Sequence, residues 1–318
     1  MELITTQSKN DSCQNKTIKP YYSSWLDSWI DYLDVKPSSI KTYTIAIQQF
    51  LKFLQHNSIV KPTRQDIYNY RDELLAKGLK ASTIVSYLQS VKAFFEWLNT
   101  EHLYENIAER VKAPRVSYKH GFHKDYLTSK QVKQLLRSIK KDTAIGRRDF
   151  ALCLLLVTTG LRTIEASRAN IEDLKVVGSF TALFIQGKGR DDKNEMVLIP
   201  ELLEKALKES ITDRLKVKES DPIFCSLASN CKGHRLSNSS ISRIIKTRLR
   251  SIGLNSTRLT AHSLRHTAAT LNLLAGGTIA ETQQLLRHSN INTTMIYSHA
   301  LERAKNRSEE RILKKIGL

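Results

Sequence analysis

Histidine, arginine and tyrosine side chains that could act on a phosphodiester lie close together near the C-terminal end of the sequence. His262 and Arg265 are three residues apart in a segment with helical spacing, so both could contact one phosphate group. His288 follows at the expected end of the next helix, and Tyr297 comes nine residues later. A guanidinium donates paired hydrogen bonds to phosphate oxygens, and an activated tyrosine hydroxyl is a nucleophile. Each residue alone is a weak signal, because most histidines and tyrosines only pack or cap helices.

A buried helix and a glycine are expected to position a second arginine. Residues 150–159 form an apolar run with helical spacing, and Gly160 is the residue type that ends helices in the left-handed conformation. Arg162 and Glu165 follow directly. These two side chains are therefore expected to lie just beyond a helix that is fixed in the core.

A β-hairpin is expected further along the chain. Residues 181–186 and 195–199 are rich in β-forming side chains, and a turn with two glycines joins them. This is the one clear sheet signal of the sequence. Lys188 lies in the turn, where a mobile side chain could enter a site.

Five segments in this order resemble the tyrosine recombinase (phage integrase) family. They are residues 158–166 (TTGLRTIEA), 187–189 (GKG), 262–266 (HSLRH), 286–288 (LRH) and Tyr297. The resemblance covers the whole second half of the chain in order and spacing. The N-terminal helices look like the SAM-like core-binding domain of that family, which binds DNA.

The resemblance implies a role for each matching residue. Arg162 and Arg265 would grip the scissile phosphate, and Tyr297 would be the nucleophile. The phenol has an ordinary pKa near 10, so it needs help to lose its proton, and His262 would act as the base. Lys188 would protonate the leaving 5′ oxygen.

Two more positions and the overall reaction follow from the same resemblance. His288 matches the position that holds histidine or tryptophan in the family, and Glu165 would orient neighbouring groups without reacting. The expected product is a 3′-phosphotyrosyl link with a free 5′ hydroxyl, which can attack again and rejoin the strands. The chemistry needs no ATP, metal or other cofactor, and we expect none.

The sequence of 318 residues is long enough for two domains. Its patterning predicts a mainly α-helical protein with a small β-sheet, and four regions: a flexible tail (1–19), a helical core DNA-binding domain (20–110), a basic linker (111–126), and an α+β catalytic domain ending in a docking helix (127–318). Capping boxes formed by Thr128 with Gln131 and by Thr278 with Glu281 predict two helix starts in the catalytic domain.

The charge of the chain favours a polyanionic partner, and double-stranded DNA is the leading candidate. There are 50 Lys and Arg against 31 Asp and Glu, a formal charge of +19. Residues 222–280 contain no acidic residue, and neither a signal peptide nor a membrane span is apparent, which favours a cytoplasmic location. The expected DNA-contacting residues lie in this segment and in the linker: Arg243, Lys246, Arg250, Lys119 and Lys124.

The four cysteines are scattered and are expected to be reduced thiols. Cys225, Cys231 and His234 are near one another, but no Cys-x-x-Cys pair and no fourth ligand accompany them, so we expect no metal site.

Several alternatives stay open at this level. A type IB topoisomerase shares the chemistry, and a non-catalytic DNA-binding protein could keep the fold. Family resemblance implies a homo-tetramer on two DNA sites, in which residues 300–318 form an amphipathic helix that docks on a neighbouring protomer or on its own domain. The biological role is either integration and excision of a mobile element or resolution of DNA dimers. Residues 1–19 are too short to fold as an extra DNA-binding domain, which favours an Xer-like or transposon-type enzyme.

Overall fold

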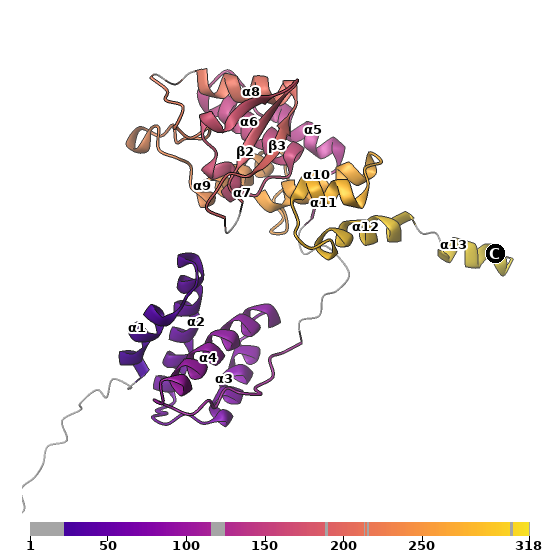
Figure 1. Ribbon diagram of the computed structural model, residues 1–318. Coiled ribbons are helices and arrows are strands. Elements are labelled where there is room, and N and C mark those ends of the chain that lie inside the picture. Colours follow the sequence, from indigo (N-terminus) through magenta and orange to yellow (C-terminus); the bar gives the residue numbers. More distant parts are fainter. Residues whose placement is uncertain are drawn as a thin grey trace, which may run out of the picture. The chain divides into compact units, whose positions relative to one another are not determined.

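Two compact units make up the chain, Met1–Ser117 and Tyr118–Leu318 (Figure 1). The computed structural model describes residues 22–115, 125–187, 190–212, 214, 216–305 and 308–317. Both units are mostly helical, and the second contains a small β-sheet, which confirms the predicted fold class. Within these ranges, no helix is long and apolar enough to cross a membrane.

The described residues of the first unit form four helices: α1 (Tyr22–Tyr32), α2 (Pro37–His56), α3 (Arg64–Ala76) and α4 (Ala81–Thr100). Pro37 is the first residue of α2, where its missing N–H leaves no hydrogen bond unmade. Thr63 begins α3 through a capping box, and the carboxylate of Asp66 accepts from its backbone N–H at 2.7 Å. Trp29 of α1 packs edge-on against Phe94 of α4, with ring centroids 5.3 Å apart. Aromatic burial thus joins the first helix to the last.

The second unit combines helices with one antiparallel sheet. Its elements are α5 (Ser129–Ser138), α6 (Ala144–Thr159), α7 (Thr163–Arg168), η1 (Ile171–Asp173), β1 (Leu174–Val177), β2 (Phe180–Ile185), β3 (Glu195–Ile199), α8 (Glu201–Thr212), η2 (Ser229–Cys231), α9 (Asn238–Ser251), α10 (Ala261–Leu274), α11 (Ile279–Leu286), α12 (Asn292–Lys305) and α13 (Ser308–Lys315). Both predicted helix starts are confirmed: Thr128 caps α5 and Thr278 caps α11.

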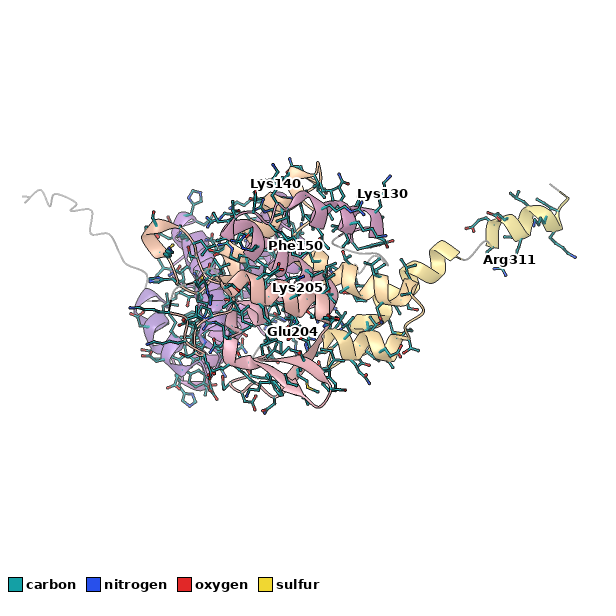
Figure 2. The ribbon with its side chains drawn as sticks, turned by 90° about the horizontal axis from the view of Figure 1, so that it is seen from above. Lys130, Lys140, Phe150, Glu204, Lys205 and Arg311 are labelled. Carbon is teal, nitrogen blue, oxygen red and sulfur yellow. The ribbon has the colours of Figure 1, made fainter. Side chains whose placement is uncertain are left out.

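The sheet has the strand order β1-β2-β3, and both pairings are antiparallel. The predicted hairpin is confirmed, with Ile185 opposite Glu195 at the end that leads into the turn. Strand β1 was missed because it has four residues and shows no alternation of buried and exposed side chains; Val176 is 76% exposed. Thr181 of β2 donates a hydrogen bond to Glu204 of α8 at 2.7 Å, which ties that helix to the sheet (Figure 2).

Helix α6 forms the centre of this unit. Most of its side chains are buried, and it packs against α8 on one side and α10 on another. It ends at Gly160, which has φ of 63°, as predicted. A Cβ at this position would lie 2.7 Å from a methyl group of Leu286, so glycine is required by space as well as by conformation.

The C-terminal segment forms two helices where one was predicted. Helix α12 continues through Tyr297 to Lys305, and α13 begins at Ser308. The apolar side chains Ile312 of α13 and Ile316, directly after it, are 60% and 64% exposed; Arg311 in Figure 2 marks this helix. Within the described residues of the second unit, the apolar face of α13 is therefore exposed.

Candidate active site

A pocket of about 300 Å³ gathers most of the residues that were predicted to be catalytic. Side chains from the start of α7, from α10, from α12 and from the segment between α11 and α12 line it: Arg162, His262, Arg265, His266, His288, Ser289, Thr293, Ile296 and Tyr297. Five of these were predicted to be catalytic, and His266 was not.

Arg265 is the buried guanidinium of the pocket. It is 2% exposed and donates to the carbonyl oxygens of Gly160, at 2.5 Å, and of Leu286. Burial, and next the charge of Arg162, lower the pKa of Arg265 to about 10, so the side chain remains charged at neutral pH. Its two carbonyl partners come from the end of α6 and the end of α11, which fixes the guanidinium before any phosphate binds.

Glu165 holds the second arginine in place. Its carboxylate is fully buried and accepts from Nη1 of Arg162 at 2.8 Å and from the Arg162 backbone N–H at 2.7 Å. Burial alone would raise the pKa of Glu165, but the positive charge of Arg287 and the bonds from Arg162 outweigh it, so the pKa is lowered. An ionised Glu165 therefore orients Arg162.

Arg287 is an arginine that sequence reasoning did not assign. Its Nη2 lies 3.0 Å from Oε2 of Glu165, its side chain is 8% exposed, and its φ is 53°. A non-glycine residue in the left-handed region is uncommon and points to a local constraint. The sequence signal that could have revealed Arg287 is its place beside His288 at the expected helix end.

His288 lies near both pocket arginines. Its Nδ1 is 2.9 Å from the hydroxyl of Thr294. Burial, and then the charges of Arg265 and Arg162, lower the pKa of His288 to about 4. The imidazole is therefore neutral at pH 7 and can accept or donate one hydrogen bond.

Tyr297 lies on α12 with its ring 3% exposed, and its hydroxyl is 2.7 Å from Nδ1 of His266. Burial raises the pKa of the phenol to about 12, although Arg265 and Arg162 act in the opposite direction. His262, the histidine expected to be the base, is exposed and packs edge-on against His266, with ring centroids 4.7 Å apart. His266 could have been found from the sequence, since it is four residues after His262 on the same helix face.

The other residues predicted to act in catalysis or DNA binding do not line this pocket or are outside the described residues. Lys188 in the hairpin turn, and Lys119 and Lys124 in the linker, are outside the described residues. Lys246 on α9 donates to the backbone carbonyls of Ser256 and Leu259, at 2.6 and 3.0 Å.

The other two residues expected to bind DNA also lie on α9. Arg250 donates to Asn255 at 2.9 Å, and Arg243 is exposed. Among the described residues, no group of three or more potential metal ligands comes together, and Cys153, Cys225 and Cys231 are free thiols.

The arrangement suits phosphoryl transfer to a tyrosine. Two guanidiniums can stabilise charge on non-bridging phosphate oxygens, and a phenol within hydrogen-bond distance of a histidine lies beside them. The fold and the pocket thus define an enzyme of phosphodiester exchange.

Comparison with known proteins agrees with this class. The profile of the Phage integrase family matches residues 125–303, and that of the Phage integrase N-terminal SAM-like domain matches residues 26–102. Tyrosine recombinase XerA of Pyrococcus furiosus is 31% identical over 300 residues, which are 94% of this chain and 96% of that protein. Tyrosine recombinase XerC of Bacillus pumilus is 29% identical over 282 residues, 85% of this chain and 90% of that one.

Solved structures share the fold at lower identity. The XerH site-specific recombinase bound to a palindromic difH substrate has a TM-score of 0.71 at 23% identity, covering 90% of this chain and 85% of that one. A lambda integrase dimer bound to a COC′ core site has a TM-score of 0.64 at 17% identity, covering 85% and 96%.

The chain belongs to the phage integrase family of tyrosine recombinases, which cleave and rejoin DNA through a phosphotyrosine intermediate. It is a site-specific recombinase by this membership, and neither the topoisomerase nor the non-catalytic alternative is favoured.

Proposed function

We propose that Tyr297 is the nucleophile of this recombinase and that Arg162 and Arg265 bind the scissile phosphate. The observation that carries the proposal is one pocket that holds the Tyr297 hydroxyl together with both arginines. Arg265 is already fixed by two carbonyl groups and Arg162 by Glu165. Preorganised donors of this kind lower the energy of a charged transition state without having to reorganise.

In the proposed reaction, the hydroxyl of Tyr297 gives its proton to a histidine of the pocket, and Oη bonds to phosphorus while the bond from phosphorus to the 5′ oxygen breaks. Lys188 supplies the proton to that oxygen, and neutral His288 donates a hydrogen bond to a phosphate oxygen. The product is a 3′-phosphotyrosyl link, and attack by a 5′ hydroxyl from either strand reverses the step. The energy of the original bond is retained, so rejoining needs no ATP.

The proposed substrate is duplex DNA with a specific core site, and the proposed assembly is a homo-tetramer on two sites. The XerH and lambda integrase structures are complexes with DNA, and this chain carries a formal charge of +19. The exposed apolar face of α13, with Ile312, Leu313 and Ile316, would dock on a neighbouring protomer. We expect the enzyme to act on cytosolic DNA, either in dimer resolution or in movement of an element.

The test uses a duplex selected from a random pool by its binding to the Tyr297→Phe protein. A nick placed beside the scissile phosphate lets the released 5′ fragment diffuse away, so that covalent protein–DNA accumulates. We expect wild type, and the Tyr68→Phe control in the other unit, to form a band that survives denaturing electrophoresis. Tyr297→Phe should bind the duplex equally well and form none. A covalent band with Tyr297→Phe would refute the assignment.

A further inference from the structure

The hydroxyl of Tyr297 lies within hydrogen-bond distance of His266. The distance from Oη to Nδ1 is 2.7 Å, and the two ring centroids are 5.4 Å apart. Such a distance is that of a strong hydrogen bond. His262, by contrast, meets the ring of His266 edge-on and is itself exposed to the pocket. The histidine in contact with the reacting atom is thus the one that directly follows Arg265.

The surroundings of His266 favour its neutral form in the DNA-free protein. Burial, and next the proximity of His262, Arg265 and His288, lower its pKa to about 4. Among the described residues, the groups that shift this pKa, together with Tyr297, come from three parts of the fold: two from α10, one from the segment between α11 and α12, and one from α12. A neutral imidazole has one acceptor nitrogen, whereas a protonated imidazole has none.

We propose that His266 is a further catalytic residue, which accepts the proton of the Tyr297 hydroxyl through Nδ1 as Oη bonds to the scissile phosphorus. This inference rests on the proposed role of Tyr297. In the step, the Oη–H bond breaks and its electron pair forms the Oη–P bond, while the proton moves to Nδ1. The P–O5′ bond breaks at the same time, and the leaving oxygen receives a proton from Lys188. His266 then carries a positive charge until the reverse step returns the proton.

Binding of DNA prepares His266 for this task. The bound phosphodiester carries a negative charge and lies among Arg162, Arg265 and His288, so it offsets the positive charges that disfavour a protonated His266. The pKa of His266 therefore rises toward neutrality only when a phosphate fills the pocket. A base with a pKa near the working pH is the most effective, and the empty pocket keeps the nucleophile protonated. His262 is exposed and lines the same pocket, where it would contact a phosphate oxygen.

Two substitutions of His266 distinguish its hydrogen bond to the Tyr297 hydroxyl from its proposed role as the base that accepts the hydroxyl proton. His266→Asn keeps a hydrogen-bond acceptor at the δ position but is not a base at neutral pH, and His266→Phe removes both functions. His234→Asn is the control, because His234 is exposed and does not line the pocket. Covalent protein–DNA formation is measured under single-turnover conditions with the nicked duplex, and binding and thermal unfolding are measured alongside.

We expect both His266 variants to bind DNA as wild type does and to form the covalent link about 100-fold more slowly at pH 7, the usual size of a general-base effect. The pH profile distinguishes a base from a structural residue. The wild-type rate should be nearly constant from pH 7 to 9, whereas the His266→Asn rate should rise about tenfold per pH unit as hydroxide replaces the missing base. An Asn variant with the wild-type rate and profile would overturn the proposal.

A duplex with a sulfur atom in place of the 5′ bridging oxygen gives a second readout. A thiolate leaves without being protonated, because its pKa is far lower than that of an alcohol. This duplex should restore the rate of Lys188→Ala but not that of His266→Asn. Recovery of His266→Asn on it would assign His266 to the leaving group and refute the proposal.

The DNA-free protein gives a test that needs no substrate. The proposed acceptor role requires that Nε2, and not Nδ1, carries the ring proton of His266. Nitrogen-15 NMR of the His266 ring, assigned with His266→Asn, reports which nitrogen is protonated. A protonated Nδ1 at pH 7 would contradict the inference even if Tyr297 is the nucleophile. A covalent link formed by Tyr297→Phe would instead contradict the proposed function.

Discussion

The carboxylate of Glu165 accepts a hydrogen bond from Nη2 of Arg287 at 3.0 Å, and both side chains are almost completely buried. The same carboxylate holds Arg162 at 2.8 Å. Nε of Arg287 lies 3.8 Å from Glu195, the first residue of β3 in the hairpin that carries Lys188. These ion pairs therefore link Arg162, which we propose binds the scissile phosphate, to the segment that carries His288 and to the base of the hairpin.

Replacing Arg287 by glycine should test the strength of this link. Glycine relieves the left-handed backbone strain, worth about 1 kcal/mol, but loss of a buried ion-pair partner costs about 3 kcal/mol. We expect a net loss of about 2 kcal/mol, seen as a Tm lower by about 4–8 °C, and roughly tenfold slower covalent-complex formation. Lys216→Gly is the control, because Lys216 has a φ of 54° but is exposed.

A double-variant cycle completes the test. Glu165→Gln in the Arg287→Gly background removes a buried charge that has lost one of its two arginine partners, so it should recover part of the lost stability. Arg287→Gly as stable and active as wild type would show that the ion pair is dispensable.

Gly160→Ala should displace the carbonyl groups that accept hydrogen bonds from the Arg265 guanidinium. The new Cβ has an unfavourable φ and meets Leu286, while the carbonyls of Gly160 and Leu286 are the two acceptors of the Arg265 guanidinium. We expect a loss of about 2 kcal/mol or more and slower DNA cleavage. Gly178 has nearly the same φ, 61°, and open space around it. Gly178→Ala should therefore lower the free energy of unfolding only through backbone strain, without a steric contact. Equal losses in the two variants, measured by urea unfolding, would argue against the contact.

The protein should lose stability as the pH falls from about 6.5 to 4. In the folded state the pKa of His288 is about 4, below the value near 6.5 of an unfolded chain, so protonation favours unfolding. The stability that this histidine contributes is therefore complete above pH 6.5 and is lost on acidification. His288→Gln should reduce the drop in Tm between pH 7 and 4 by a few degrees, which corresponds to about 1 kcal/mol. If Tm of His288→Gln fell as much between pH 7 and 4 as Tm of wild type, the lowered pKa of His288 would be contradicted. His234→Gln, at an exposed histidine, is the control.

Two basic residues of α9 should behave differently toward DNA. Arg243 is exposed, so Arg243→Ala should leave Tm unchanged, weaken DNA binding and reduce the slope of log affinity against log salt by about 1. Lys246 bonds to two backbone carbonyls, so Lys246→Ala should lower stability by about 1–2 kcal/mol. Fluorescence anisotropy across a salt series, with thermal unfolding, measures both effects. An unchanged salt slope for Arg243→Ala would remove Arg243 from the DNA interface.

Local signals in the sequence were enough to place most of the elements around the site. The capping boxes at Thr128 and Thr278 and the glycine at position 160 act within a few residues, and each was found where predicted. Strand β1 escaped prediction because its short, exposed sequence becomes a strand only through pairing with β2.

Contacts between distant residues could not be predicted in the same way. His266 and Tyr297 are 31 residues apart and meet because α12 packs against α10. Arg287 and Glu165 are 122 residues apart, and the left-handed conformation of Arg287 has no pattern in the sequence. The resemblance supplied the types of catalytic residue, whereas the partner of each one depends on tertiary packing.

We propose that Tyr297 is the residue that becomes linked to DNA. The most direct test is to trap the covalent complex of the wild-type protein, digest it with nuclease and protease, and locate the nucleotide-bearing residue by mass spectrometry. We expect a single modified peptide, with a nucleotide attached through its 3′ phosphate to Tyr297. A nucleotide on any other residue, or a link through a 5′ phosphate, would contradict it.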